Sequence, residues 1–326
     1  MKTFNAMVRV LTVGVLMAVA GQVFAQQSYP SKPIRFIVPY TPGGTTSILA
    51  RLAGQRLTES WGQTVIVDNR PGGNTIIGSE ALVKSAPDGY TMLLAASTLV
   101  VLPHLYKNLP YDPIKDFAPV ATLASSELVL VLHPSLPLNN LQAFIAFAKS
   151  RPGELNHASA GSGGSPHLAG ELFNIMAGVQ IQHIPYKGSG PLVTDLLGGQ
   201  VQLAFAVPFA VLSHIKSGRL KAIAVSGESR LPALPQVPTF TEGGLPGFNV
   251  TNWYGVLVPA GTPNEIINKL ATELARFVAM PDTREKLVSQ GVAPFISTPD
   301  QFAALLKAEL AKFARIIKTA NIKLGN

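Results

Sequence analysis

The sequence predicts an α/β protein, and two features of the chain support this prediction. Short apolar runs of strand length alternate with longer segments whose apolar residues recur at helical spacing. Glycine-rich turns separate several of these runs from the segment that follows, as at residues 40–47 and 158–167. We therefore expect strands and helices to succeed one another along most of the chain.

In the first half of the chain, the apolar runs are short and rich in Val, Ile and Leu, which is typical of strands. We expect strands at residues 34–40, 65–68, 91–95, 120–124 and 128–133. Helical spacing, as shown by Leu141, Phe144 and Ala148, predicts the intervening helices. These cover residues 45–60, 75–85, 100–106 and 141–151.

The second half repeats the alternation and then ends in three helical patterns. We expect strands at residues 156–160, 181–185, 201–207, 220–225 and 254–258. The helices, one of which stops at Gly198-Gly199, cover residues 167–177, 191–197, 209–216, 263–279, 282–290 and 299–320. The apolar stripe of Ile266, Leu270, Leu274 and Phe277 predicts a helix face that packs on the core.

The N-terminus predicts a Sec-type signal peptide, residues 1–25, that is cleaved after Ala25. Lys2 and Arg9 precede an uncharged apolar run, and small residues flank Phe24 at the cleavage site. An uncleaved anchor is the alternative, but the apolar run is short for a bilayer span. We expect an exported, periplasmic mature chain that starts near Gln26.

The composition argues against several classes of function. The precursor has a formal net charge of +8, but its basic residues form no run that could follow a nucleic-acid backbone. The chain has no cysteine for a lipid anchor or a disulfide framework. Its six histidines lack the spacing of a metal site. We expect no nucleic-acid partner, no metal and no cofactor.

Two stretches of the sequence mark the boundaries between three segments of the chain and thereby predict two domains. One boundary lies at residues 120–127, between two expected strands, and the other is the loop-rich stretch 231–253. We assign residues 26–124 together with 250–326 to domain 1 and residues 125–249 to domain 2. The chain would then cross twice between the domains and leave a cleft at the hinge. Ligands of such sheets bind beyond the carboxyl ends of the strands, at helix N-termini.

Three segments share the order strand, glycine-rich turn and helix: YTPGGTTS at 40–47, NRPGGNT at 69–75 and ASAGSGGSPH at 158–167. Glycine permits a positive φ and the close approach of a ligand. The first N–H groups of a helix favour negative charge, and the hydroxyls add neutral donors. This chemistry suits a carboxylate. Taken singly, each segment is equally consistent with a tight turn whose Ser or Thr caps the helix.

The same segments do not fit the nucleotide-binding motifs. Lys187 is followed by glycine, so no Walker A sequence exists. The G-x-G-x-x-G fingerprint is absent at residues 43–48, and Pro166 occupies its last position at residues 161–166. A nucleotide is therefore a poor candidate for the ligand.

A secreted serine hydrolase remains a minor alternative. Residues 160–164 come close to the nucleophile elbow G-x-S-x-G, but Ala160 replaces its first glycine. Ser162 would be the nucleophile, with Asp195 and His214 as its available partners. This alternative predicts turnover of an ester that is lost in Ser162→Ala.

Several stretches, taken in order, resemble the exported solute receptors of tripartite tricarboxylate transporters, the Bug-type family. The resemblance covers nearly all of the mature chain. It depends on YPSKPIRFIVPYTPGG at 29–44, VDNRPGGNTIIG at 67–78, APDGYTMLLAA at 86–96, IPYKGSGPLVTDLLGGQVQLAF at 184–205 and VPTFTEGGLPGFNVTNWYGVLVPAGTP at 237–263. The resemblance implies a two-lobed periplasmic binding protein of the Venus-flytrap type, which captures a small carboxylate without covalent chemistry.

The resemblance also implies where the ligand binds. In the family, the turn that corresponds to residues 40–47 and the domain-two turn at residues 159–164 supply most ligand contacts. The expected ligand-binding residues are Tyr40, Thr41, Gly43, Gly44, Thr45, Ser47, Ser97, Ser159, Gly161, Ser162, Gly163, Gly164 and His167. The implied partners of this expected monomer are membrane transporter subunits, or alternatively a periplasmic sensor kinase.

One position departs from the family pattern. The first motif usually reads PGG-x-x-D-x-x-A-R, whereas this chain has Ser47 at the place of the aspartate and retains Arg51. The change removes a negative charge near the expected pocket. We hypothesise that the pocket thereby tolerates a second carboxylate or no longer favours an ammonium group.

Overall fold

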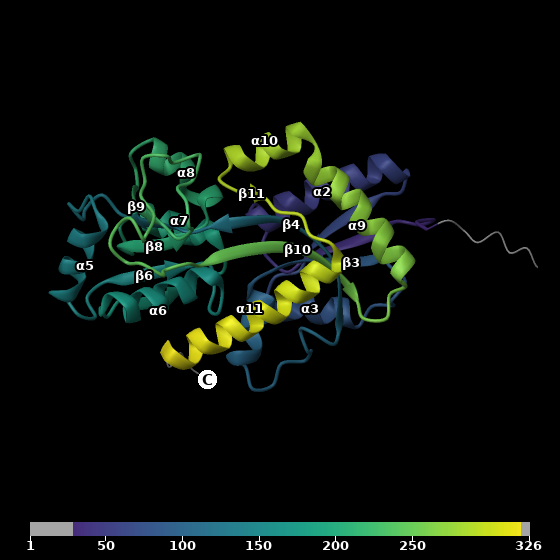
Figure 1. The fold of residues 1–326 in the computed structure, drawn as a ribbon, viewed down its shortest axis with the longest axis horizontal. Coiled ribbons are helices and arrows are strands. Elements are labelled where there is room, and N and C mark those ends of the chain that lie inside the picture. The colour runs from purple at the N-terminus through teal and green to yellow at the C-terminus, as the bar shows by residue number, and fades with distance from the viewer. Residues whose placement is uncertain (1–28, 321–326) are drawn as a thin grey trace, which may run out of the picture.

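The structure, a computed structural model that describes residues 29–320, consists of two α/β lobes that lie side by side (Figure 1). The expected signal peptide, residues 1–25, lies outside the described residues. Within residues 29–320, no helix combines the length and the apolar character that a bilayer span requires. Each lobe is built on its own sheet and is defined by it.

The first lobe contains a six-stranded sheet with the order β11-β4-β10-β3-β1-β2. Strand β1 is parallel to β2 and β3, whereas β10 runs antiparallel to its neighbours β3 and β4. The strands are β1 (Ile34–Val38), β2 (Val65–Asn69), β3 (Thr91–Ala96), β4 (Phe117–Glu127), β10 (Thr251–Pro259) and β11 (Ala293–Pro294).

Helices cover both faces of this sheet because its buried strands present apolar side chains to either side. Phe36 of β1 packs in one core with α2, α9 and α10, and Ile37 packs in a second core with α3, α4 and α11. The helices are α2 (Thr45–Trp61), α3 (Ile76–Val83), α4 (Thr98–Val101), α9 (Asn264–Ala279), α10 (Pro281–Ser289) and α11 (Pro299–Ala320). Short 3₁₀ turns, η1 (Gly73–Thr75) and η2 (Leu102–His104), complete the lobe.

The second lobe contains a five-stranded sheet with the order β7-β6-β8-β5-β9. Strands β6, β7 and β8 are parallel, and β5 is antiparallel to β8 and β9. The strands are β5 (Val129–Leu132), β6 (Asn156–Ser159), β7 (Gln182–Pro185), β8 (Leu203–Ala206) and β9 (Lys221–Val225). Helices α5 (Leu141–Lys149) and α6 (Ser165–Ala177) contribute to one core, and α7 (Ser189–Leu197) and α8 (Pro208–Lys216) to the other.

The two connections between the lobes are bonded to each other at Ser226, which is fully buried. A single residue, Leu128, separates β4 from β5, and its backbone N–H donates to the Ser226 hydroxyl at 2.8 Å. The Ser226 hydroxyl in turn donates to the carbonyl of Val250 at 2.5 Å, one residue before β10. Both chain crossings therefore bond to the same buried hydroxyl, that of Ser226.

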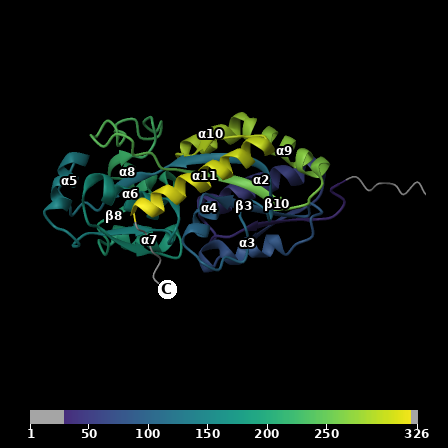
Figure 2. The same cartoon turned by 60° about the horizontal axis from the view of Figure 1, so that its bottom comes forward.

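Helix α11 extends along the outside of both lobes, as Figures 1 and 2 show from two directions. It packs on β4 and α4 of the first lobe and on α6 of the second. Leu168 of α6 belongs to the same buried cluster as Phe302 and Phe313 of α11. The C-terminal helix thus adds an apolar contact between the lobes beside the two crossings.

The structure confirms the α/β class and most of the expected elements, and four elements differ from the expectation; one is β10, which begins at Thr251 rather than at residue 254. Strand β4 extends beyond the expected residues 120–124 because it pairs with β10 along its whole length. The expected helix at residues 100–106 begins earlier and is only a short α4 followed by η2. Strand β11 is not among the expected strands because two residues are too few to show a period. The numerical domain bounds remain a prediction.

The contact between β10 and α11 makes a prediction about Gly255. A Cβ added to Gly255 would lie 2.3 Å from Cζ of Phe302, a fully buried ring. We expect Gly255→Ala to lower the free energy of unfolding by about 1–3 kcal/mol, because the core must shift to admit the methyl group. Urea denaturation measures this change.

Gly190 supplies the matched control, because a Cβ added there meets no atom within 4 Å. In α7, Gly190→Ala should leave stability unchanged or raise it by up to about 1 kcal/mol. Equal effects of the two substitutions would contradict the packing described for β10 and α11.

Candidate functional site

A cavity of about 750 Å³ lies between the lobes. Its lining includes residues at or just after the carboxyl ends of β1, β2 and β3 in the first lobe and of β6, β7 and β8 in the second. Open α/β sheets bind ligands at such strand ends, because the helices that follow direct their N-termini there. The fold therefore directs two sets of strand ends toward one space.

The turns before α2 and α6 have the same backbone conformation. Gly43 and Gly163 have φ values of 89° and 76°, in the left-handed region that favours glycine. The following N-cap glycines, Gly44 and Gly164, are extended with ψ values of 170° and 163°. Neither helix has a side-chain cap. The N–H groups of each first helical turn therefore have no side-chain cap, although Pro166 leaves α6 with one N–H fewer than α2.

Each of these helices also begins with a buried hydroxyl residue that lines the cavity. Thr45 of α2 is 7% exposed, and Ser165 of α6 is 1% exposed. Neither hydroxyl oxygen meets the geometry of a hydrogen bond within the described part of the chain, although the Thr45 hydroxyl lies near enough to the Tyr254 hydroxyl to lower the pKa of that tyrosine. A buried hydroxyl without a partner is costly. These two oxygens, one from each lobe, are therefore the strongest indication of a polar ligand.

The turn after β2 is strained and bridges the lobes. Asn74 and Thr75 line the cavity with φ values of 55° and 78°, and they are the only non-glycine residues with positive φ in residues 29–320. Positive φ is unfavourable for a β-branched residue such as Thr75, and backbone strain is typical of functional sites. The Asn74 side-chain amide donates to the carbonyl of Ser162 in the other lobe.

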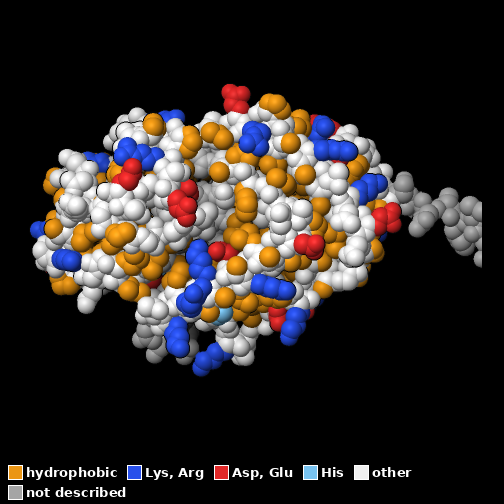
Figure 3. Space-filling model, in the orientation of Figure 1, with side chains coloured by type: hydrophobic (Ala, Val, Ile, Leu, Met, Phe, Trp, Pro, Cys, Tyr) orange, Lys and Arg blue, Asp and Glu red, His pale blue; other side chains and the backbone are white. Residues whose placement is uncertain are grey.

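The turn after β7 supplies the cavity with a cation. Lys187 is the only charged residue among the described residues that line it. Its neighbour Gly188 approaches the first lobe so closely that an added Cβ would lie 2.7 Å from Oγ1 of Thr41. Elsewhere, Lys, Arg, Asp and Glu are scattered over the outer face of both lobes (Figure 3). The cavity is thus neutral apart from one positive charge.

Two tyrosines add neutral donors to the first-lobe side of the cavity. Tyr40 and Tyr254 both line it, and the Tyr40 hydroxyl donates to Oγ1 of Thr98 at 3.3 Å. Burial raises the pKa of Tyr40 above its usual value and that of Tyr254 to about 12. Both hydroxyls therefore keep their protons near neutral pH. The Tyr254 hydroxyl can donate to an anion, whereas the Tyr40 hydroxyl already donates to Thr98.

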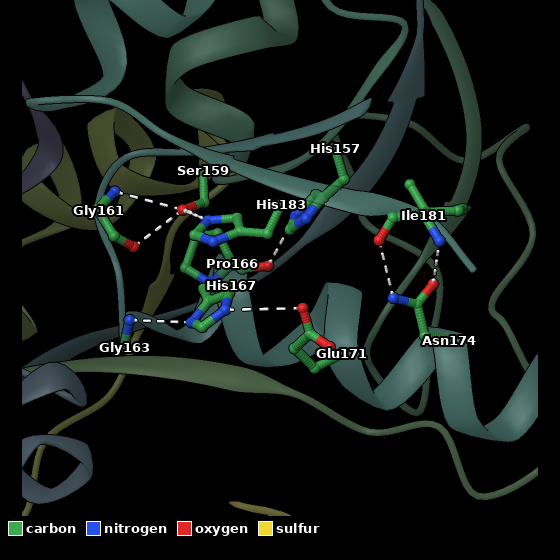
Figure 4. Close-up of polar contacts among 10 residues, drawn as sticks. All are labelled: His157, Ser159, Gly161, Gly163, Pro166, His167, Glu171, Asn174, Ile181 and His183. Atoms are coloured by element: carbon green, nitrogen blue, oxygen red, sulfur yellow. Dashed lines mark hydrogen bonds and ion pairs between the residues drawn. The ribbon is translucent and has the colours of Figure 1, made fainter. Parts of the chain in front are cut away.

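A cluster of three histidines supports the second-lobe turn from behind (Figure 4). The rings of His167 and His183 are stacked with centroids 3.8 Å apart, and His157 lies 5.3 Å from His183. His167 Nδ1 accepts the backbone N–H of Gly163 at 3.0 Å, and His183 Nε2 lies 2.6 Å from the Ser159 hydroxyl. The cluster thus fixes the turn rather than facing the cavity.

Burial keeps these histidines neutral. Desolvation lowers the pKa of His157 to about 3, that of His167 to about 4 and that of His183 to about 2. The histidines also disfavour one another's protonated forms, most clearly for His157 and His183. No group of His, Asp or Glu within residues 29–320 could hold a metal ion.

Comparison with known proteins identifies the family. The model of the tripartite tricarboxylate transporter family receptor matches residues 49–322. The chain belongs to this receptor family. The family consists of solute-binding proteins, which are not enzymes as a class.

Relatives of this receptor cover nearly its whole length. It is 41% identical to Protein BugT of Bordetella pertussis (strain Tohama I) over 98% of this chain and 99% of BugT. The solved structure named R. palustris Rpa4515 with adipate is 35% identical, with a TM-score of 0.87, over 90% of this chain and 99% of that one. MatC from Rhodopseudomonas palustris with bound malate is 29% identical, with a TM-score of 0.83, over 89% and 100% of the respective chains.

The structure brings about half of the expected site residues of the receptor to the cavity. Those that line it are Tyr40, Thr41, Gly44, Thr45, Gly161, Ser162 and Gly164. Those that do not are Gly43, Ser47, Ser97, Ser159, Gly163 and His167. Members of the second group shape or support the turns. Ser97, for example, is fully buried, and its hydroxyl donates to Asn252 Oδ1.

Ser47, at the position where the family usually has aspartate, is fully buried beneath the first turn. The Asn69 amide donates to the Ser47 hydroxyl at 3.3 Å and to the Tyr40 carbonyl at 3.0 Å. Arg51 also reaches Asn69, at 3.5 Å. Ser47 can therefore influence the ligand by holding the turn. The hypothesis about its effect on ligand choice remains a prediction.

Several lining residues are absent from the expected set, notably Asn74, Thr75, Ser165 and Lys187. The NRPGGNT segment is recognisable in the sequence as a strand–turn–helix unit, but the expected site includes no residue of it. The segment PYKGSG after β7 has the same order of strand, glycine and helix, which is the available signal for Lys187.

The residues suggested for a hydrolase are not assembled. The described structure contains no hydrogen bond between Ser162 and either Asp195 or His214. Asp195 instead accepts a hydrogen bond from the Tyr186 hydroxyl at 2.8 Å. The receptor thus lacks the linked nucleophile and base that this alternative requires.

The histidine cluster predicts how the stability of the receptor depends on pH. Above pH 6.5 the three histidines are neutral in both the folded and the unfolded chain. Below pH 6.5, the three histidines become protonated in the unfolded chain but stay neutral in the folded chain. The free energy of unfolding should therefore fall between pH 6.5 and about 4, by up to about 1.4 kcal/mol per pH unit for each histidine.

Urea denaturation at pH 7, 6, 5 and 4.5 measures this slope. His183→Asn removes one of the buried groups and should make the slope shallower than that of the wild type. Identical slopes for His183→Asn and the wild type would contradict the role given to the cluster.

Proposed function

We propose that this receptor captures a small carboxylate between its lobes in the periplasm and delivers it to a membrane transporter. The observation that carries the proposal is the pair of buried, unpartnered hydroxyls of Thr45 and Ser165 at the starts of α2 and α6. A carboxylate accepts hydrogen bonds from both hydroxyls and from the N–H groups of the two first helical turns. It also interacts favourably with both helix dipoles.

The electrostatics of the cavity favour an anion over a cation or an amino acid. No Asp or Glu is among the described residues that line it, and Lys187 is the one charged group. An ammonium group would find no carboxylate partner there. Each charge-assisted hydrogen bond contributes about 1.5–3 kcal/mol, so a few of them support micromolar affinity after the costs of binding.

The relatives support the same ligand class. Two of the structures to which this chain is similar contain adipate and malate. Both compounds are small dicarboxylates. The first-lobe turn of this chain keeps the PGG sequence and the buried hydroxyl that a carboxylate requires, although Ser47 replaces the family aspartate.

Contacts between the lobes explain how the ligand acts on the conformation. The Asn74 amide bonds to the Ser162 carbonyl of the other lobe, and Gly188 lies too close to Thr41 for a Cβ to fit between them. A ligand that bonds to both Thr45 and Ser165 has higher affinity for this closed arrangement than for an open one. It therefore shifts the population toward the closed state. A transporter, or alternatively a sensor kinase, would recognise that state, and the family name favours the transporter.

Removing either hydroxyl should weaken carboxylate binding. Thr45→Val and Ser165→Ala delete one donor each with little change of shape. We expect each to raise the Kd for malate or adipate about tenfold or more, because a charge-assisted hydrogen bond is lost. Isothermal titration of refolded protein measures Kd. A thermal shift that rises with ligand concentration confirms binding to the folded state.

Ser213→Ala, on the exposed face of α8, is the matched control and should bind as the wild type does. The proposal fails if no small carboxylate raises the melting temperature. It fails equally if Thr45→Val and Ser165→Ala retain wild-type affinity.

Lys187 makes a separate prediction about salt. Lys187→Met should raise the Kd for a dicarboxylate several-fold, because the cavity loses its only cation. The remaining affinity should vary less with ionic strength than that of the wild type. Lys216→Met, at an exposed position of α8, is the control. An unchanged salt dependence in Lys187→Met would show that Lys187 does not act on the ligand.

A further inference from the structure

One wall of the cavity is apolar. It is formed at a strand end, as the neighbouring polar walls are. The carboxyl end of β8 and the first turn of α8 line the cavity with Ala206, Val207 and Ala210. Leu192 of α7 extends the same surface. By contrast, the strand ends of β6 and β7 bring Ser162, Ser165, Lys187 and Ser189 to the cavity.

The start of α8 differs from those of α2 and α6 in its N-cap residue, although α6 also has a proline in its first turn. Val207 occupies the N-cap position, where an apolar residue is among the least favoured and Ser, Thr, Asp and Asn lead. Pro208 follows and has no N–H group, and the N–H of Ala210 is already bonded to the Val207 carbonyl at 3.0 Å. This helix terminus therefore offers few donors and mainly carbon surface to a ligand.

Charged and hydroxylated ligand groups cannot be satisfied at this wall. A carboxylate or hydroxyl placed against Val207 and Ala210 would lose its hydration without gaining a hydrogen bond. A methylene chain or ring there gains the free energy of apolar burial instead. The lining thus includes both hydroxyl donors, at Thr45 and Ser165, and an apolar surface at β8 and α8.

We propose that the ligand is a carboxylate with an apolar body, and that Val207 and Ala210 select for that body. The proposal rests on the proposed function, since it takes the carboxylate to lie at Thr45 and Ser165. A fatty acid of medium length, or a dicarboxylate with a methylene spacer, fits this description. Compact polyhydroxylated acids do not.

Two matched ligand pairs test the preference by isothermal titration at fixed pH and salt. Adipate and galactarate are six-carbon dicarboxylates that differ only in four hydroxyl groups. Hexanoate and gluconate are the corresponding monocarboxylates. We expect the wild type to bind the apolar member of each pair about tenfold or more tightly.

Val207→Thr should reduce the ratio of the two Kd values in each pair about tenfold, because it adds a hydroxyl to the wall at constant volume. Its melting temperature should not fall, since threonine is a better N-cap than valine. Ala210→Ser provides a second variant of the same wall. Val288→Thr, on the exposed surface of α10, is the control.

The outcomes separate this proposal from the function on which it rests. Equal or tighter binding of galactarate and gluconate overturns the proposal but leaves a carboxylate receptor. Unchanged preferences in both Val207→Thr and Ala210→Ser also overturn it. If neither these acids nor malate bind, the proposed function fails, and this inference fails with it.

Discussion

The structure depends on the point where the chain crosses twice between its lobes. The hydroxyl of Ser226 accepts from Leu128 and donates to Val250, so both crossings are held by one buried side chain. Strand β10 pairs with β4 over the full length of β4 and thereby fixes how the sheet of the first lobe is oriented. Because of this arrangement, the parallel strands of both sheets direct their carboxyl ends toward one cavity.

The chemistry of the site is a consequence of that constraint. Each lobe contributes a turn of the same conformation and a helix that begins with a buried hydroxyl. These groups are neutral, so the site needs only one cation, Lys187, to favour an anion. The strain at Asn74 and Thr75 is maintained where one lobe bonds to the other. Preorganised neutral donors and a bonded interface suit a receptor that closes on its ligand.

Short sequence patterns predicted the features that depend on neighbouring residues in the chain, namely strands, helices and turns. Apolar period identified most strands and helices, and paired glycines located the turns whose positive φ the structure confirms at Gly43 and Gly163. The sequence could not show which hydroxyls of a turn face the cavity. Thr45 and Ser165 face the cavity, whereas Ser47 and Ser159 face inward to Asn69 and His183. Lys187 and Asn74 lie in strand–turn–helix segments that the sequence shows, but they were missed because the meeting of distant turns in space decides which side chains reach the cavity.

The central claim is that one carboxylate bonds to both lobes at once. A double-mutant cycle with Thr45→Val and Ser165→Ala, read out as the affinity for one dicarboxylate, tests it most directly. If a single carboxylate bridges the two hydroxyls, the losses of binding free energy in the two single variants should not add up to the loss in the double variant. The coupling energy should be about 1 kcal/mol or more. Additive losses, within about 0.5 kcal/mol, would mean that the two hydroxyls act on separate groups and would contradict the claim.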